Sequence, residues 1–229
     1  MKQNIIVLFC LAIAYLGCKD QSKASSPVIK NRGVISENAM VVSAREEASK
    51  IGVEILKQGG NAFDAMMATE MALAVCYPYA GNLGGGRFLI FGMADGSIGA
   101  LDYREKAPLA SSKDMYLDEN GDVIKDLSTV GSMAVGIPGT IAGVFKAQKR
   151  FGKLDIETVL KPVIELAKQG YTITKKQEER ITSYDSMFKA VNEKEILYNK
   201  NLKAGQSICL LYTSPSPRDL STSRMPSSA

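Results

Sequence analysis

The segment that most constrains this chain is AFDAMMATEMALAV at residues 62–75, which is apolar on nearly every side when it forms a helix. A helix of this kind must be covered by neighbouring elements on several sides, because a surface helix shows only one apolar stripe. Asn61, a preferred N-cap residue, precedes it, and Pro78 ends it. With 229 residues and 45% hydrophobic content, the chain is long enough for one substantial core around this helix.

Before this helix, the sequence predicts a short strand and another helix. Val41 and Val42 indicate the strand. Ser43 and Glu46 have the spacing of a capping box, and the helix that they begin ends at Gly59–Gly60. Its apolar side consists of Ala48, Ile51, Ile55 and Leu56.

After the apolar helix, the sequence predicts a hairpin and then three helices. Residues 88–93 and 97–103 flank Asp95–Gly96, a pair typical of a tight hairpin turn. A weaker turn signal lies at Asn120–Gly121. The three helices are marked by Pro138–Gly139, by Asp155 with Gly170, and by a capping box of Thr174 and Gln177. This order of helices and strands predicts one α/β unit.

The composition argues against two broad classes of function. The net charge is only +4, and the lysines are spread along helical segments, so nucleic acid is not an expected partner. The chain has no histidine, which is the commonest general base and metal ligand. We expect no metal and no cofactor, and any chemistry must use other groups.

The N-terminus has the pattern of an export signal. An apolar run from Ile5 to Leu16, too short for an ordinary transmembrane helix, leads into Gly17 and Cys18. This ending resembles a bacterial lipoprotein cleavage box, in which Cys18 carries the lipid; a plain secretory signal or an N-terminal anchor is the alternative. We predict a signal peptide at residues 1–17, a flexible tether at 18–33, and a location in the bacterial cell envelope, facing the periplasm.

The cysteines do not indicate a disulfide framework. Cys10 lies in the predicted signal and Cys209 near the C-terminus, so Cys76 has no obvious partner. Cys76 lies in the apolar run MALAVCYP, and we expect a small core residue there, with a reactive thiol as the alternative.

The end of the chain differs in composition from the rest. Residues 208–229 are rich in serine, threonine and proline and show no helical period. They also resemble adapter-derived translations at the ends of reading frames assembled from environmental sequence. We expect residues 34–207 to form the folded unit and residues 208–229 to be a disordered, non-native tail, with a natural Ser/Pro tail as the alternative.

Three consecutive glycines, Gly84, Gly85 and Gly86, stand directly before the first predicted strand. A phosphate-binding loop or a dinucleotide fingerprint would lead into a helix, so neither fits. Two interpretations remain open: a structural tight turn, or a turn that lets another segment approach closely.

Arg104 follows the second predicted strand and lies between Asp102 and Glu105. A guanidinium matches a carboxylate in bidentate fashion, and an arginine at a strand end can point into a cleft. A solvated ion pair with an acidic neighbour is the alternative, which spacing alone favours.

Several motifs agree in order and spacing with one known family. They are MVVSAREEASKIGVEILKQGGNAFDAMMATEMALAVCYPYAGNLGGGRF, LDYREKAPLAS, DMYLDENG, VGIPGTIAGV and ELAKQGYTI, which span about residues 34–200. Together they resemble the N-terminal part of the bacterial gamma-glutamyltransferases, also called glutathione hydrolases. Two positions depart from the family pattern, because glycine is usual where Arg87 stands and histidine is common where Arg45 stands.

The resemblance implies an N-terminal-nucleophile hydrolase of class α/β (α+β), a four-layer αββα sandwich that is incomplete in this chain. Such an enzyme is a precursor that cuts itself before a threonine. The threonine hydroxyl is then the nucleophile and its amino group the general base, so no histidine is required. The enzyme passes the gamma-glutamyl group of glutathione, as a threonyl ester, to water or an amino acid. Arg104, in the DYRE motif, is implied to bind the α-carboxylate of that group.

The same resemblance places the catalytic threonine in a small subunit beyond this chain, so no catalytic residue is expected here. Thr129, Thr140 and Thr172 are interpreted as structural. The chain alone is expected to be inactive, with exposed strands that need the missing half. Two alternatives come from other classes: a lipid-anchored periplasmic protein that binds an amino acid or peptide through Arg104, and a purely structural lipoprotein.

Overall fold

The computed structural model describes residues 33–192, 196–200 and 202–210. The chain divides into two units, Met1–Glu37 and Asn38–Ala229, and the description below concerns the second. The predicted signal peptide, Cys18, nearly all of the tether and residues 211–229 lie outside the described residues. No helix in the described ranges is long and apolar enough to cross a membrane.

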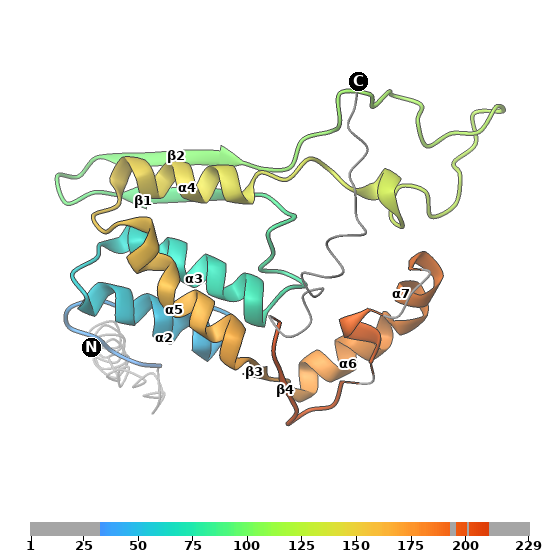
Figure 1. Cartoon of the computed structure of the whole chain (residues 1–229). Helices are drawn as coiled ribbons and strands as arrows, with labels where there is room; N and C mark the ends of the chain where they lie inside the picture. The colour runs from blue at the N-terminus through green and yellow to red at the C-terminus, as the bar shows by residue number, and fades with distance from the viewer. Residues whose placement is uncertain (1–32, 193–195, 201, 211–229) are drawn as a thin grey trace, which may run out of the picture. The chain divides into compact units, whose positions relative to one another are not determined.

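Helix α3 (Ala62–Cys76) forms the centre of the core, as its sequence predicts (Figure 1). It packs against α2 (Glu46–Lys57), α4 (Thr140–Phe151) and α5 (Ile156–Gln169). Its neighbours bury it on several sides, which satisfies the requirement of a helix that is apolar all round. Its fully buried hydrophobic side chains are Met67, Ala68, Ala72 and Cys76.

The predicted cap of α3 by Asn61 is confirmed. The Asn61 side chain accepts hydrogen bonds from the backbone N–H groups of Phe63 and Asp64, and Asp64 accepts from the Asn61 N–H at 2.9 Å. Asp64 is fully buried and also accepts from the Lys153 N–H at 2.9 Å and from the Gln148 amide at 3.2 Å. A buried carboxylate needs such partners, and these tie the start of α3 to the loop between α4 and α5.

The predicted hairpin is also confirmed. Strands β1 (Arg87–Gly92) and β2 (Ile98–Tyr103) pair antiparallel around the Asp95–Gly96 turn, in which Gly96 has a φ of 84°. One face of the hairpin packs on the core through Phe91, whose ring lies 5.3 Å from that of Phe63 in α3.

The other face of the hairpin is apolar and uncovered among the described residues. Phe88, Ile90 and Ile98 are 64%, 82% and 86% exposed, and they alternate with the residues that face the core. A sheet layer that lacks the second layer of a sandwich shows this pattern. The described residues thus form an incomplete α/β fold, as expected.

The C-terminal part contains short elements. Strand β3 (Tyr171–Thr172) pairs antiparallel with β4 (Ser207–Ile208). Asp155 caps α5 by accepting from the Thr158 N–H at 2.8 Å, and the predicted capping box of Thr174 and Gln177 forms. The remaining elements are α6 (Lys175–Ser183), α7 (Asp185–Val191) and the 3-10 turns η1 (Ser132–Ala134) and η2 (Leu197–Asn199).

The prediction for the start of α2 is wrong in detail. The N-cap is Arg45, without a capping side chain, because the Ser43 hydroxyl donates to the Arg45 carbonyl at 2.8 Å. Val41 and Val42 lie in no strand. At Asn120–Gly121 the predicted second hairpin is reduced to one isolated bridge between Leu117 and Val123.

The predicted end of the folded unit at residue 207 falls inside β4. Ile208 is 4% exposed and pairs with Tyr171, and the Cys209 thiol donates to the Lys168 carbonyl at 2.9 Å. The folded region therefore includes residues 208–210, which the prediction assigned to the tail.

Candidate functional site

The glycine turn before β1 lies against the end of β2. A Cβ at Gly86 would overlap the backbone nitrogen of Glu105 and lie 2.5 Å from the Tyr103 carbonyl oxygen, so only glycine fits there. At Gly84 and Gly85 the nearest atom to an added Cβ is the Asn82 side-chain oxygen, at 3.6 and 3.2 Å. Of the two interpretations that the sequence leaves open, close approach applies to Gly86.

A second glycine, Gly139, also lies close to this backbone. A Cβ at Gly139 would overlap the carbonyl oxygen of Tyr103. The N–H groups of Gly139 and Thr140 both donate to the Gly85 carbonyl at 3.0 Å. The backbone around Tyr103 and Arg104 is thereby fixed between the glycine turn and the start of α4.

Arg104 lies directly after β2 with an exposed guanidinium. Its side chain is 58% exposed; Nε lies 3.2 Å from Oε2 of Glu105, and the guanidinium carbon lies 5.7 Å from the Phe88 ring centroid. Asp102 accepts the backbone N–H of Arg104 at 2.9 Å. Among the described residues, the two terminal nitrogens have no hydrogen-bond partner, so the edge that binds a carboxylate is available.

Glu105 is held in its ionised form. Its own backbone N–H, the Arg104 guanidinium and the Gly86 N–H together lower the pKa of the carboxyl group. Its Oε2 atom is buried and accepts no hydrogen bond within the described ranges, which leaves the ion pair to Arg104 as its contact. Glu105 therefore fixes one edge of Arg104 and leaves the other edge open.

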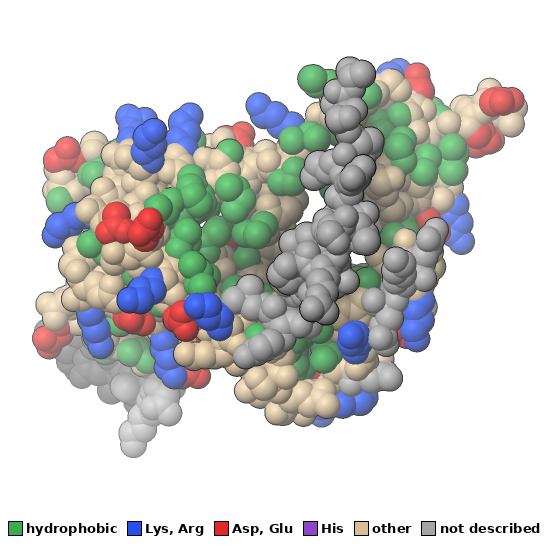
Figure 2. Space-filling view, in the orientation of Figure 1, with side chains coloured by type: hydrophobic (Ala, Val, Ile, Leu, Met, Phe, Trp, Pro, Cys, Tyr) green, Lys and Arg blue, Asp and Glu red, His purple; other side chains and the backbone are tan. Residues whose placement is uncertain are grey.

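A cavity of about 280 Å³ adjoins Arg104 between the end of β2 and the start of α4. Three cationic residues, Arg104, Lys106 and Lys146, contribute to its lining, together with the single acidic residue Asp102. This charge balance suits an anionic group. Elsewhere on the surface the basic and acidic side chains are interspersed around hydrophobic patches, as Figure 2 shows for one face.

The threonines of the chain are dispersed. Thr140 is fully buried at the start of α4, Thr172 lies in β3, and the Thr129 hydroxyl donates to the Asp126 carbonyl at 3.2 Å. The described part of the chain holds no group of three potential metal-ligating side chains. The chemistry that Arg104 and its cationic neighbours support is the binding of an anion.

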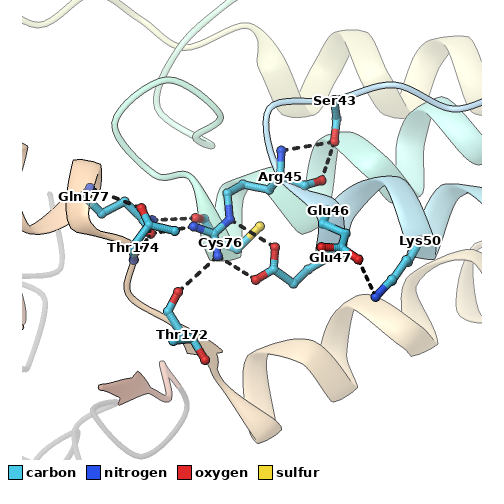
Figure 3. A network of polar contacts seen from close by, with 9 residues as sticks. All are labelled: Ser43, Arg45, Glu46, Glu47, Lys50, Cys76, Thr172, Thr174 and Gln177. Atoms are coloured by element: carbon cyan, nitrogen blue, oxygen red, sulfur yellow. Dashed lines mark hydrogen bonds and ion pairs between the residues drawn. The ribbon is translucent and has the colours of Figure 1, made fainter. Parts of the chain in front are cut away.

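A second arginine, Arg45, forms a buried polar junction that the sequence did not predict (Figure 3). Its guanidinium is bonded to both carboxylate oxygens of Glu47, to the Gln177 side chain at 2.6 Å and to the Thr172 carbonyl at 3.1 Å. Gln177 in turn donates to the Cys76 carbonyl at 2.9 Å. We call these residues the Arg45 junction; it joins α2, α3, β3 and α6.

The charges in the Arg45 junction stabilise each other. Burial is the largest influence on Arg45 and opposes its charge, but the hydrogen bond and charge of Glu47, together with Cys76 and Tyr171, outweigh it, and the guanidinium pKa is raised. Burial likewise disfavours the Glu47 carboxylate, yet the hydrogen bond and charge of Arg45, a backbone hydrogen bond and the charge of Lys50 together leave its pKa lowered. Two sequence signals fall on this cluster: the capping box of Thr174 and Gln177, and the arginine at position 45, where the resemblance leads one to expect histidine.

Cys76 is a small core residue, as predicted. It is fully buried, and burial raises the pKa of its thiol to about 11. The thiol is therefore protonated at neutral pH and inert as a nucleophile.

Solved structures share this fold. The chain is similar to gamma-glutamyltranspeptidase from Helicobacter pylori, with 35% identity and a TM-score of 0.74 over 79% of this chain and 53% of that one. The Pseudomonas nitroreducens enzyme complexed with L-DON gives 38% identity and a TM-score of 0.70 over 78% and 52%. The Bacillus anthracis transpeptidase CapD, at 21% identity and a TM-score of 0.60 over 76% and 54%, shows the fold alone. The fold thus places the chain in the class of N-terminal-nucleophile hydrolases.

Curated relatives define the family more closely. Glutathione hydrolase proenzymes from Pseudomonas sp. strain A14 and Pseudomonas aeruginosa are 51% and 50% identical over 60% and 62% of this chain. The gamma-glutamyltranspeptidase family model matches residues 48–212, and the chain belongs to this family. It spans only 24% and 25% of those two relatives. These relatives lend no support to the alternative of a binding protein.

Proposed function

We propose that this chain is the N-terminal part of a self-processing gamma-glutamyltransferase that cleaves the gamma-glutamyl bond of glutathione and passes the glutamyl group to water or an amino acid. The observation that carries this proposal is the open guanidinium edge of Arg104 at the end of β2, within the family's DYRE motif. Family membership and names such as glutathione hydrolase proenzyme support the reaction.

Arg104 binds the α-carboxylate of the glutamyl group. Its two terminal nitrogens donate to the two carboxylate oxygens, while Glu105 retains Nε and Phe88 supports the guanidinium plane. Lys106 and Lys146 add positive potential beside the site. The loss of a bidentate partner for a bound carboxylate costs about 2–5 kcal/mol.

The remaining groups come from the second half of the precursor. Its threonine hydroxyl attacks the gamma-carbonyl carbon, the amide bond breaks with its nitrogen leaving as an amine, and the threonyl ester then reacts with water or an amino acid. The uncovered apolar face of the hairpin, with Phe88, Ile90 and Ile98 exposed, supports docking of that half.

A hybrid proenzyme tests this proposal. Residues 38–210 of this chain replace the matching residues of the Pseudomonas aeruginosa proenzyme, which is 50% identical over the aligned region. We expect the hybrid to cleave itself into two subunits, visible by gel electrophoresis, and to release p-nitroaniline from gamma-glutamyl-p-nitroanilide. A self-cleaved hybrid without turnover contradicts the proposal.

The 229-residue chain alone provides the complementary measurement. Half of an active site should not hold its ligand, so titration calorimetry is expected to show no micromolar binding of glutamate or glutathione. Micromolar binding by this chain indicates a binding protein and contradicts the assignment of Arg104 to an incomplete enzyme site.

We further propose that Cys18 carries a lipid and anchors the protein in the cell envelope, facing the periplasm. The support is the sequence pattern of an apolar run followed by Gly17 and Cys18. Expression in bacteria with labelled palmitate is expected to label the chain, and Cys18→Ala is expected to abolish the label. Equal labelling of both proteins overturns the anchor.

A further inference from the structure

Arg87 occupies the position directly after the glycine turn and connects that turn to the core. Its Nη1 lies 2.9 Å from Oε2 of Glu70 in α3, and its Nη2 donates to the Ala80 carbonyl at 2.7 Å. The second bond closes the loop of residues 80–87 on itself, because Arg87 ends the loop and Ala80 begins it. The turn is thus fixed both to α3 and across its own ends.

Glu70 is a costly residue to bury without this partner. It is 8% exposed, and burial raises the pKa of its carboxyl group while Arg87 opposes that rise. Its other oxygen, Oε1, is buried with no hydrogen-bond partner in the described ranges. Arg87 therefore supplies the main compensation for the Glu70 charge, and the pair is held in one geometry.

The ion pair lies next to the backbone that carries Arg104. Arg87 is the cross-strand partner of Tyr103, the residue before Arg104. Burial and the Glu70 carboxylate raise the pKa of the Tyr103 hydroxyl, whereas Arg87 lowers it, so the three side chains share one environment. On its other side Arg87 follows Gly86, whose backbone contacts Glu105 closely.

We propose that Arg87 is a positioning residue for Arg104. Its bonds to Glu70 and Ala80 fix the glycine turn, the turn packs closely against the backbone of Glu105, and the Glu105 carboxylate fixes Nε of Arg104 so that the opposite edge faces the substrate carboxylate. Arg87 touches neither substrate nor reacting atoms. The inference rests on the proposed function for the role of Arg104, but the link from Arg87 to Arg104 is measurable without turnover.

The first measurement uses the full 229-residue chain with arginine labelled at Nε with ¹⁵N. The Nε–H signal of Arg104 is assigned by its loss in Arg104→Lys. We expect Arg87→Met to move the chemical shift of this signal toward that of a free arginine, because the ion pair to Glu105 is loosened, and Arg87→Lys, which keeps the ion pair to Glu70, to restore part of the shift. Arg150→Met, which removes an exposed arginine of α4, is the matched control and leaves the signal unchanged.

The second measurement uses the hybrid proenzyme and reads KM and kcat for gamma-glutamyl-p-nitroanilide. Arg87→Met is expected to raise KM about tenfold with kcat nearly unchanged, since a misdirected Arg104 weakens binding of the glutamyl carboxylate. Glu70→Gln, which preserves shape and removes only the charge, should act in the same direction if Arg87→Met fails to fold. An Arg104 signal that neither variant alters overturns the inference, whether or not the hybrid turns over. If the signal changes while the wild-type hybrid is inactive, the proposed function fails and the positioning role stands.

Discussion

Arg45 and Arg104 carry the same side chain in two opposite settings. Arg45 is 8% exposed, and all three of its guanidinium nitrogens donate to Glu47, Gln177 or Thr172. Arg104 is 58% exposed and has one ion pair, through Nε, to Glu105. The first guanidinium uses four of its five N–H donors within the fold, whereas the second has a complete edge to offer.

This difference shows that unused donors distinguish the two roles better than charge does. A guanidinium presents five N–H donors in a rigid fork, and a structural arginine such as Arg45 uses most of them within the fold. In a binding site, part of the fork must remain open until the ligand arrives. Arg87 lies between these extremes, since it bonds Glu70 and Ala80 while 30% exposed.

The largest effect is expected from a substitution that breaks the Arg45 junction. Arg45→Met leaves the half-buried Glu47 carboxylate without its cation and removes the bonds to Gln177 and to the Thr172 carbonyl, so we expect the hybrid to lose about 3–4 kcal/mol of unfolding free energy. Urea unfolding followed by circular dichroism measures this. Lys50→Met is the matched control, because its ion pair with Glu46 is exposed on the same helix. An equal shift of the unfolding midpoint in both variants contradicts the structural role of Arg45.

The second prediction tests whether the open edge of the Arg104 guanidinium binds substrate. Arg104→Lys keeps the charge but loses the bidentate fork, and kcat/KM of the hybrid is expected to fall about 100-fold, equivalent to about 3 kcal/mol, chiefly through KM. The urea midpoint should stay unchanged because Arg104 has few contacts within the fold. Arg150→Lys, which changes an exposed arginine of α4, is the control. Unchanged kcat/KM in Arg104→Lys removes this residue from the substrate site.

A smaller effect is expected from a substitution at Gly86, which tests the close packing of the backbone between Gly86 and Gly139. Gly86→Ala forces a Cβ into the backbone of Tyr103 and Glu105, which is expected to cost about 2 kcal/mol of stability and to raise KM. Gly84→Ala adds a Cβ whose nearest neighbour lies at 3.6 Å, so it should be neutral. Equal unfolding midpoints for the two variants, measured in urea, would show that close approach at Gly86 has no energetic consequence.

The smallest effect is a pH dependence of the Arg45 junction. The pKa of Glu47 is lowered in the folded state, so its contribution to stability is present above the unfolded-state pKa and is lost as the pH falls through the folded-state value. We expect wild type to lose more unfolding free energy than Glu47→Gln as the pH falls below about 5. Glu54→Gln, exposed on the same helix, is the control, and parallel curves for wild type and Glu47→Gln would argue against the coupling.

The sequence by itself determined the elements whose signals are local. Asn61 caps α3 through N–H groups two and three residues away, and Asp95–Gly96 sets the register of the hairpin. The all-round apolar pattern of α3 required a central position, which the structure confirms. In each case the atoms that interact lie within a few residues or within one repeating pattern, so the sequence contains the whole interaction.

The tertiary structure alone decided the environment of the arginines and of Gly86. Arg45 meets Gln177 across 132 residues and Arg87 meets Glu70 across a helix and a loop, so no spacing rule reveals either pair. At the start of α2 the Ser43 hydroxyl bonds the Arg45 carbonyl instead of capping the helix, and Arg45 is the N-cap. Whether an arginine donor is used, or a glycine is needed, depends on which distant backbone folds against it, and only packing in three dimensions determines that.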